Sequence, residues 1–390
     1  MCMSKKPLTS LLNEFLSSEK AGGFVLIACT LISLLVANSA AGDAYLGIWH
    51  APVFGEAVEY WINDGLMTIF FLLVGLELKR EVLAGELSTV RKSLLPIFAA
   101  AGGMIIPAGV YYLINKDGAA TDGTGIPMAT DIAFALGILS LLGSRVPAGL
   151  KIFLTALAVI DDLGAILVIA IFYTSDLVLD NLAISLAIWG GLFLLQRLKV
   201  RFLLIYLLGG AAMWYFMLHS GVHATITGVL LAFVIPFNKD DSLSLSYKLQ
   251  HWLHKPVAFI ILPVFALANT GIILETGWAQ GLSSPMGLGI IGGLVVGKPL
   301  GILIFSAIAV LTGLSQLPSG VNWKHVAGAG MLAGIGFTMS IFISLLAFTD
   351  SQLVISAKIA ILCASLLAAV AGLVWLALTS GKRTAENDRP

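Results

Sequence analysis

The stretch LTALAVIDDLGAILVIA, residues 154–170, places Asp161 and Asp162 side by side in the middle of an apolar run. An ionised side chain at the centre of a lipid bilayer costs roughly 2.5–3.5 kcal/mol on insertion scales. Neighbouring residues of an α-helix point about 100° apart, so the two carboxylates cannot face one partner squarely. The pair therefore favours a functional site with two separate tasks over one structural polar contact inside a helix bundle.

The composition indicates an integral membrane protein. Of the 390 residues, 58% are hydrophobic and 11% are charged, whereas a soluble domain is about a quarter charged. The net charge is zero, so nothing suggests a nucleic-acid partner. Cys2, Cys29 and Cys363 lack metal-ligand spacing and are predicted to be inert thiols. No GxxxxGK[ST] motif occurs, so nothing indicates an activity driven by a bound nucleotide, and we expect no bound cofactor.

About twelve segments are long and apolar enough to be membrane spans, which need about 20 residues each. They lie near 21–38, 58–78, 94–114, 121–142, 152–173, 181–196, 202–218, 222–237, 256–272, 287–311, 326–347 and 352–379. All basic residues except Lys116, Lys298 and Lys358 fall on one set of alternate loops. Because cytoplasmic loops are enriched in Lys and Arg, both termini are predicted to be cytoplasmic. We expect one transporter domain over 1–390, with a retained first helix and its longest loops at 39–57 and 238–255.

Two further charges lie deep in predicted spans. Lys298, in VVGKPLG, is too far from either end of its span for its amine to reach water, so it is predicted to pair with a buried carboxylate or to titrate. Asp131, in GIPMATDIAFALG, follows Pro127 and Thr130. Pro127 frees a backbone carbonyl and Thr130 supplies an oxygen, as a cation site requires. A carboxylate that only compensates charge at a helix break is an equally open interpretation of Asp131.

The fourth and eleventh spans are predicted to be broken. Gly334-Ile-Gly336 falls in the middle of the eleventh span, and an unwound segment is tolerated there only where protein or a water-filled cavity satisfies the backbone. The two spans cross the bilayer in opposite directions. The predicted fold is therefore an all-α polytopic membrane protein with about twelve transmembrane helices, inverted repeats and two broken, crossing helices.

Five motifs together resemble the NhaA family of sodium/proton antiporters, whose fold is itself an example of inverted repeats. They are ATDIAFALG (129–137), AVIDDLGAI (158–166), SGVHATITG (220–228), GKPLG (297–301) and GIGFTMSIFI (334–343), in order over nearly the whole chain. The resemblance implies export of Na+ or Li+ in exchange for inward H+ across the bacterial inner membrane. It also implies an inverted-repeat core packed on a dimerisation unit, with a homodimer contact made by a hairpin within 43–58.

The resemblance also implies roles for the buried charges. Asp162 would be the main Na+ or Li+ ligand, and Asp161 its neighbour, paired with Lys298. Asp131 would face the positive helix ends where the broken spans cross, Lys298 the negative ones, and Thr130 would lie near the site. Burial raises the pKa of a carboxyl group and a nearby ammonium lowers it, so protons and sodium can compete for the same groups. The proton carriers stay open between Asp161 with Asp162 and Asp162 with Lys298, and the three can titrate as one unit.

Members of this family are activated at alkaline pH. The matching positions are Glu77, Arg80, Glu81, His251 and His254, although solvated interfacial charges explain each residue alone equally well. Gln250 stands where a well-studied member has an acidic residue, which leaves the pH threshold open. His223 is at most modulatory. Glu59 and Asp64 are weak candidates for an outer ion funnel.

Two rival functions are weighed against antiport. An intramembrane aspartyl protease could use Asp131 and Asp161, but its glycine-x-glycine-aspartate signature does not occur, and a mid-span lysine has no role there. A sodium-coupled symporter of a small organic solute fits broken helices and a sodium site, but gives no reason for Lys298 beside a double aspartate.

Overall fold

The computed structural model describes residues 19–174, 177–238, 244–274 and 277–380, and these are almost entirely helical. The strands found in these ranges are β1 (Pro52–Val53) and β2 (Glu56–Ala57), which pair antiparallel. The helices of the first half are α2 (Glu19–Ala37), α3 (Gly42–His50), α4 (Val58–Tyr60), α5 (Met67–Ala84), α6 (Val90–Asn115), α7 (Ile132–Leu141), α8 (Ala148–Phe172) and α9 (Leu179–Arg197). Those of the second half are α10 (Leu203–Leu218), α11 (Ile226–Val234), α12 (Leu245–Pro256), α13 (Leu262–Asn269), α14 (Pro285–Gly292), α15 (Lys298–Leu311), α16 (Trp323–Ala333), α17 (Phe337–Ala347) and α18 (Ser351–Thr379).

Short helical segments of other geometry join or extend these helices. Three are π-helical: η1 (Trp61–Leu66), η5 (Val257–Ile261) and η7 (Gly293–Gly297). Four are 3-10 helical: η2 (Glu86–Ser88), η3 (Thr121–Met128), η4 (Gly143–Arg145) and η6 (Trp278–Ser283).

The protein is an all-α polytopic membrane protein. Within the described residues, 8 helices are long and apolar enough to cross a membrane, or up to 10 if each sharply bent pair counts as one span. Every one of the twelve predicted segments contains a helix. However, α10 and α11 are shorter than that criterion requires, so the number twelve stays a prediction. The helix predicted over 222–237 is only Ile226–Val234, because Pro236 disfavours helical backbone at the residue before it.

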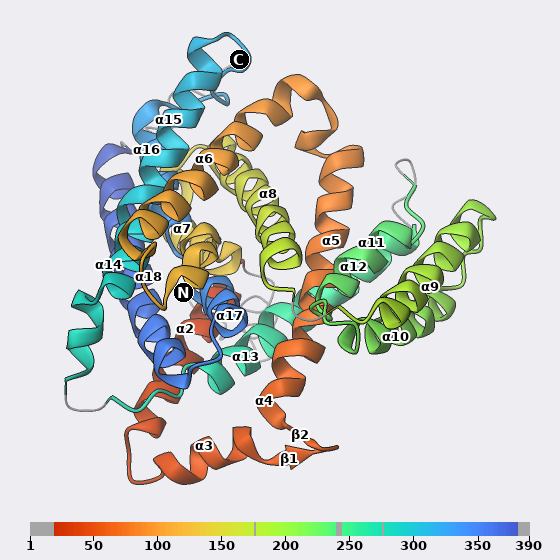
Figure 1. Cartoon of the computed structure of the whole chain (residues 1–390). Helices are drawn as coiled ribbons and strands as arrows, with labels where there is room; N and C mark the ends of the chain where they lie inside the picture. Colours follow the sequence, from red (N-terminus) through yellow and green to blue (C-terminus); the bar gives the residue numbers. More distant parts are fainter. Residues whose placement is uncertain (1–18, 175–176, 239–243, 275–276, 381–390) are drawn as a thin grey trace, which may run out of the picture.

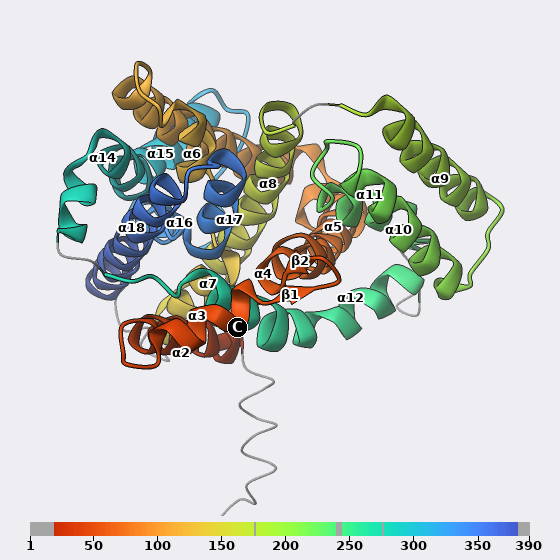
Figure 2. The same cartoon turned by 60° about the horizontal axis from the view of Figure 1, so that its bottom comes forward.

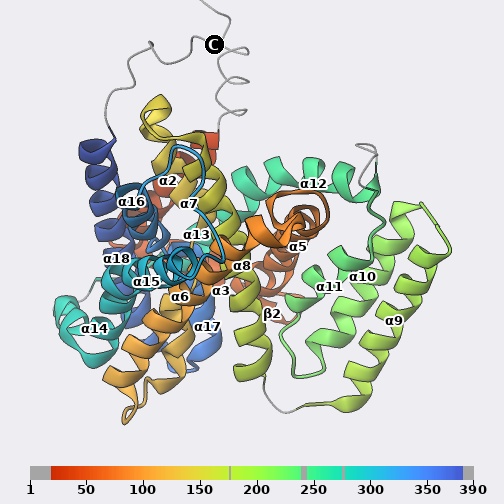
Figure 3. The same cartoon turned by 90° about the horizontal axis from the view of Figure 1, so that it is seen from above.

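The helices form two groups with α8 between them (Figures 1 and 3). On one side α9 packs on α10, α10 on α11, and α11 and α12 on α5. On the other side α6 packs on α15, α15 on α16, and α14, α16 and α17 on α18. The long central helix α8 touches both groups, through α5 and through α6 and α16. The residues of its middle, where Asp161 and Asp162 lie, are therefore shielded by protein.

The two longest predicted loops are partly helical, which corrects the sequence interpretation. The segment 39–57 contains α3, which turns by 116° from α2. The segment 238–255 contains α12, whose Leu249 and Leu253 are buried while charged residues face out. An amphipathic helix of this kind has low mean hydropathy, so a search for spans does not detect it.

The π-helical segments η5 and η7 were not predicted from the sequence. Each lies just before a proline, Pro263 and Pro299 respectively. A proline ring inside a helix clashes with the carbonyl four residues earlier, and those carbonyls belong to Phe259 and Val295, within the two segments. Widening the helix relieves the clash, and π-helical turns are frequent at functional sites. Lys298 follows η7 directly.

Close packing of α6 on α15 depends on one pair of glycines. A Cβ atom on Gly102 would overlap the carbonyl oxygen of Gly301, and a Cβ on Gly301 would overlap that of Gly102. Neither position accommodates a side chain without separating the helices. This contact holds the helix of Lys298 against α6.

The hairpin β1–β2 lies beside α3 and α4 at one end of the molecule (Figure 1), the end that faces the viewer in Figure 2. Its two turn residues, Phe54 and Gly55, have φ values of 52° and 93°, as a tight hairpin turn requires. The indole of Trp61 donates to the carbonyl of Val53 over 2.8 Å and ties the hairpin to the span. Phe54 is 94% exposed.

Candidate functional site

The breaks of the two predicted discontinuous spans meet in the structure. One separates η3 from α7 at residues 129–131, and the other bends α16 against α17 by 46°. The backbone N–H of Asp131 donates to the carbonyl of Ile335 over 2.7 Å. The hydroxyl of Ser340 donates to the carbonyl of Ile126 over 2.7 Å. Unwound backbone is thus satisfied by the partner break, as a membrane interior demands.

Asp131 binds the amino-terminal ends of two helices at once. Its Oδ1 accepts from the backbone N–H of Phe134 over 2.9 Å, in the first turn of α7. Its Oδ2 accepts from the backbone N–H of Thr338 over 3.2 Å and from the Thr338 hydroxyl over 2.5 Å, in the first turn of α17. The carboxylate therefore offsets the partial positive charge of both helix ends.

Lys298 lies on the opposite side of the crossing. Its side chain is fully buried, and its Nζ donates to the carbonyl of Met128, the last residue of η3, and to Oδ2 of Asp161. The Nζ–Oδ2 distance is 2.6 Å. The ammonium thus faces a carbonyl-bearing helix end, where a positive charge is favourable.

The two adjacent aspartates have different surroundings. Oδ2 of Asp161 lies 2.6 Å from Lys298 Nζ and 2.6 Å from the hydroxyl of Thr130. That hydroxyl also lies 2.9 Å from the carbonyl of Ala333, and its single proton can be given to only one of the two oxygens. Asp162 is buried, with only 1% of its surface exposed, yet it makes no hydrogen bond or ion pair to any residue of the described ranges. It is the buried carboxylate available for a cation.

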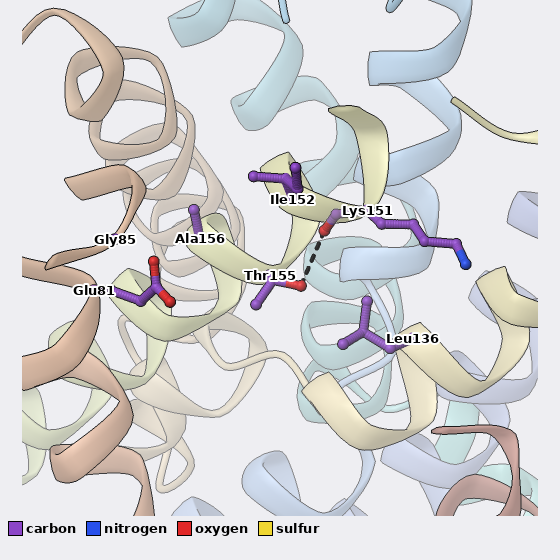
Figure 4. Close-up of a pocket in the computed structure, with 7 residues that line it drawn as sticks. All are labelled: Glu81, Gly85, Leu136, Lys151, Ile152, Thr155 and Ala156. Atoms are coloured by element: carbon purple, nitrogen blue, oxygen red, sulfur yellow. Dashed lines mark hydrogen bonds between the residues drawn. The ribbon is translucent and has the colours of Figure 1, made fainter. Parts of the chain in front are cut away.

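Two adjoining cavities lead from one end of the molecule toward the aspartates. The larger, of about 640 Å³, extends along α8 past Thr155 to Val159, one helical turn before Asp162. The smaller, of about 410 Å³, shares Glu81, Leu136 and Thr155 with it. Figure 4 shows Glu81 of α5 facing the side of α8 that carries Ala156 and Thr155.

Thr155 lies at the junction of these two cavities. Its hydroxyl donates to the carbonyl of Lys151 over 2.9 Å, while the Lys151 side chain extends away from Glu81 (Figure 4). The cavity wall near Glu81 and Thr155 therefore carries oxygen atoms, and the ammonium group of Lys151 lies away from it.

The five residues predicted to sense pH line the larger cavity together. His251 and His254 lie on α12, so they share a helix face. His254 Nδ1 lies 3.8 Å from Glu77 Oε1, and Arg80 Nη2 lies 3.0 Å from Glu81 Oε1. Gln250 also lines this cavity. The cluster joins α5 to α12 at the entrance of the path toward Asp162.

The remaining sequence candidates lie away from the ion site. His223 is in the turn before α11, where its Nε2 lies 2.8 Å from the carbonyl of Tyr173. Glu59 pairs with His50 over 3.6 Å. Asp64 is in η1, and its backbone carbonyl accepts from Thr68. Neither acidic group contacts Asp161 or Asp162 in the described residues.

Sequence reasoning missed two polar residues that the fold makes important. Thr338 follows the glycines of the eleventh span. Its hydrogen bonds to Asp131 form only because two segments distant in sequence cross, and this contact could not be predicted from the sequence. Lys79 was predicted to be one of the basic residues of the cytoplasmic loops. In the structure it is buried in α5 and donates to the carbonyls of Ala232, Phe233 and Ile235 at the end of α11. The sequence offered no signal for it, because its partners are backbone atoms.

Comparisons with known proteins agree with this architecture. The model of the family "Na+/H+ antiporter 1" matches residues 13–376. The chain is 60% identical to the Na(+)/H(+) antiporter NhaA of Flavobacterium psychrophilum over 94% of this chain and 95% of that protein. It is also 60% identical to the NhaA of Cytophaga hutchinsonii (95% and 96%) and 58% identical to that of Dechloromonas aromatica (96% and 98%). The chain therefore belongs to the Na+/H+ antiporter 1 family.

Proposed function

We propose that this chain is a secondary active transporter that exports Na+ or Li+ in exchange for inward H+. The observation that carries the proposal is the contrast between two buried neighbours: Asp161 is bound by Lys298 and Thr130, whereas Asp162 has no partner in the described residues. A buried carboxylate without a partner is costly and favours binding of a cation or a proton. These two ligands exclude each other on one group, which is the basis of exchange.

Asp162 is the main cation ligand in this proposal, and Asp161 is its neighbour. Sodium is a hard cation that binds oxygen atoms, and this site offers carboxylate, hydroxyl and backbone oxygens. Broken helices place carbonyl ends and unwound backbone at such midplane sites. Asp131 and Lys298 neutralise the opposed helix ends of the crossing, so the break persists when the bound ion changes.

Proton coupling requires more than one titrating group if exchange moves net charge. The direct contact of Lys298 with Asp161 means that these two groups cannot titrate independently of each other. Either the two aspartates, or Asp162 together with Lys298, carry the protons. Exchange of more than one proton for each Na+ is electrogenic, and the membrane potential then drives export.

We further propose that the pH dependence of transport originates in the cavity lined by Glu77, Arg80, Glu81, His251 and His254. The short distance from His254 to Glu77 supports this, because protonation of an imidazole makes the pair an ion pair. In this proposal the chain lies in the bacterial inner membrane with both termini in the cytoplasm, so this cavity opens inward. The exposed Phe54 of the hairpin supports a homodimer contact there.

The proposal is tested in proteoliposomes with an imposed inside-acid gradient. Na+, Li+ or K+ is added outside at pH 7 and 8.5, and the collapse of the gradient is followed with a fluorescent pH probe. Na+ and Li+, but not K+, are expected to dissipate the gradient, and a potassium diffusion potential is expected to change the rate. No proton movement with any cation at either pH would refute antiport. Na+ uptake that depends on an added organic solute would identify a symporter instead.

A further inference from the structure

A third cavity, of about 670 Å³, lies at the opposite end of the spans from the pH-sensing residues. It shares no lining residue with the two cavities described above. Its walls come from α3, the start of the span of α5, the end of α13, η6 and the first turns of α18. They include Trp49, Glu59, Trp278 and Lys358. None of the residues proposed to bind ions or to sense pH lines this cavity.

Lys358 is the unusual group in this cavity. It projects from the second turn of α18, within a predicted span, and makes no hydrogen bond or ion pair to a described residue. Glu59 is the acidic group that acts on it electrostatically, but at longer range than an ion pair. Glu59 is instead 3.6 Å from His50. Lys358 is half-buried and lines the cavity, so a bound anion can pair with its ammonium in surroundings of lower dielectric constant than bulk water.

The other polar groups of the cavity also favour an acceptor. Gln280, Gln352 and Ser356 supply further donors along the wall. A cation would meet the Lys358 ammonium and a carboxylate that is already paired with His50. An anion would meet an ammonium that makes no ion pair with a described residue, and the side-chain amides of Gln280 and Gln352.

Part of the wall is apolar. It is formed by leucine, isoleucine, valine and tryptophan side chains, among them Leu46, Ile355 and Ile359. The volume lies within the range usual for small-molecule sites, about 300–1,000 Å³, and the wall combines apolar with polar groups. The geometry suits a molecule with one anionic end and an apolar body.

We propose that this cavity is a binding site for an amphiphilic anion, a carboxylate or phosphate group attached to an apolar body. The anionic group pairs with Lys358, and the apolar body packs between Trp49 and Trp278. Two sources supply this chemistry, a free organic acid and the head group of an anionic lipid. The residues to which the antiport proposal assigns ion binding do not line the site, so this proposal does not depend on antiport.

The test uses the purified full chain in neutral detergent, with 3-phenylpropionate as probe and 3-phenylpropionamide as its uncharged match. Binding is followed by calorimetry and by tryptophan fluorescence. Wild type and Lys358→Arg are expected to bind the acid saturably. Lys358→Met is expected to bind it about tenfold more weakly, which corresponds to ~1.4 kcal/mol. The amide is expected to bind wild type as weakly as the acid binds Lys358→Met.

Equal affinity of wild type and Lys358→Met for the acid overturns the proposal, as does failure of folded wild type to bind it. Size-exclusion chromatography reports folding of each variant. If Lys358→Met does not fold, the comparison of acid with amide on wild type decides, and equal binding of the two overturns the proposal. Competition then separates the two sources of the anion. Displacement of the probe by phosphatidylglycerol but not by phosphatidylcholine identifies a lipid head group. A probe that stays bound in the presence of phosphatidylglycerol identifies a free acid.

Discussion

At the residue scale, the site depends on the separation of two adjacent carboxylates by a helix turn of about 100°. Asp161 faces Lys298 and Thr130, and Asp162 faces neither. Asp161 therefore has a direct cationic partner, whereas in the proposed mechanism the ion that binds Asp162 supplies that charge. Two aspartates on one face of the helix would compete for the same lysine.

Lys298→Met tests the buried pair. Removing one partner of a buried ion pair leaves the other charge uncompensated and costs about 3–5 kcal/mol. We expect a lower melting temperature for Lys298→Met, measured by fluorescence-detected size exclusion. The double variant Lys298→Met/Asp161→Asn should recover part of the loss, because the stranded charge is gone. Strictly additive losses in this double-mutant cycle would contradict a direct contact.

At the element scale, one carboxylate serves both broken helices, and for α17 it comes from outside that helix's own chain segment. Asp131 is the N-cap of α7 and also binds the first turn of α17. Its carboxylate therefore fixes both breaks together, which a cap on a single helix does not do.

Asp131→Ala should destabilise the protein more than a single cap loss, which costs about 0.5–2 kcal/mol. Asp131→Asn keeps an acceptor oxygen and should lie between wild type and Asp131→Ala in melting temperature. Asp350→Ala is the matched control, because Asp350 caps only α18 through Gln352 N–H. Equal melting temperatures for Asp131→Ala and Asp350→Ala would show that the second helix gains nothing from Asp131.

The glycine contact between α6 and α15 makes a second prediction at this scale. Gly301→Ala should lower the melting temperature and slow exchange, because the added Cβ displaces the helix of Lys298. Gly190→Ala, in α9, meets no atom within 4 Å. That control should be neutral or stabilise by about 0.5–1 kcal/mol, the helix preference of alanine over glycine. Indistinguishable melting temperatures for the two variants would mean that the helices are not in close contact there.

The elements differ in how well the sequence predicted them. The fourth and eleventh spans were predicted to break because Pro127 and the glycines at 334 and 336 are local signals, and the break positions are as expected. The pairing of Lys298 with Asp161 is also present. In contrast, α12 was missed because its apolar stripe is narrow, and η7 because a π-helical turn leaves the hydrophobic pattern unchanged. Thr338 and Lys79 were missed because their partners lie far away in sequence.

At the scale of the whole molecule, cavities open at opposite ends while the charged groups lie between them. The cavity with Glu77 and His254 ends one helical turn before Asp162. Whatever changes the charge of that cavity changes the electrostatic field along the path of the ion. If these residues sense pH as proposed, sensing and transport take place in neighbouring regions without sharing a residue.

His254→Gln tests that connection. When His254 is protonated at low pH, it forms an ion pair with Glu77, and loss of the proton at higher pH releases the pair. If the pair holds the inactive state, the variant should be active at lower pH than wild type, measured as antiport between pH 6.5 and 8.5. His50→Gln, at the opposite end, serves as the control. An unchanged profile for His254→Gln would exclude this pair as the sensor.

The central claim is that Na+ or Li+ and a proton compete for Asp162, and proton release on cation binding measures it most directly. Li+ is added to purified protein in weakly buffered solution at pH 8, and the released protons are followed with a pH dye. In wild type, the number of released protons is expected to follow the amount of bound Li+ and to saturate with it. Asp162→Asn is expected to bind no Li+ and to release no protons. Saturable Li+ binding with undiminished proton release in folded Asp162→Asn would contradict the account.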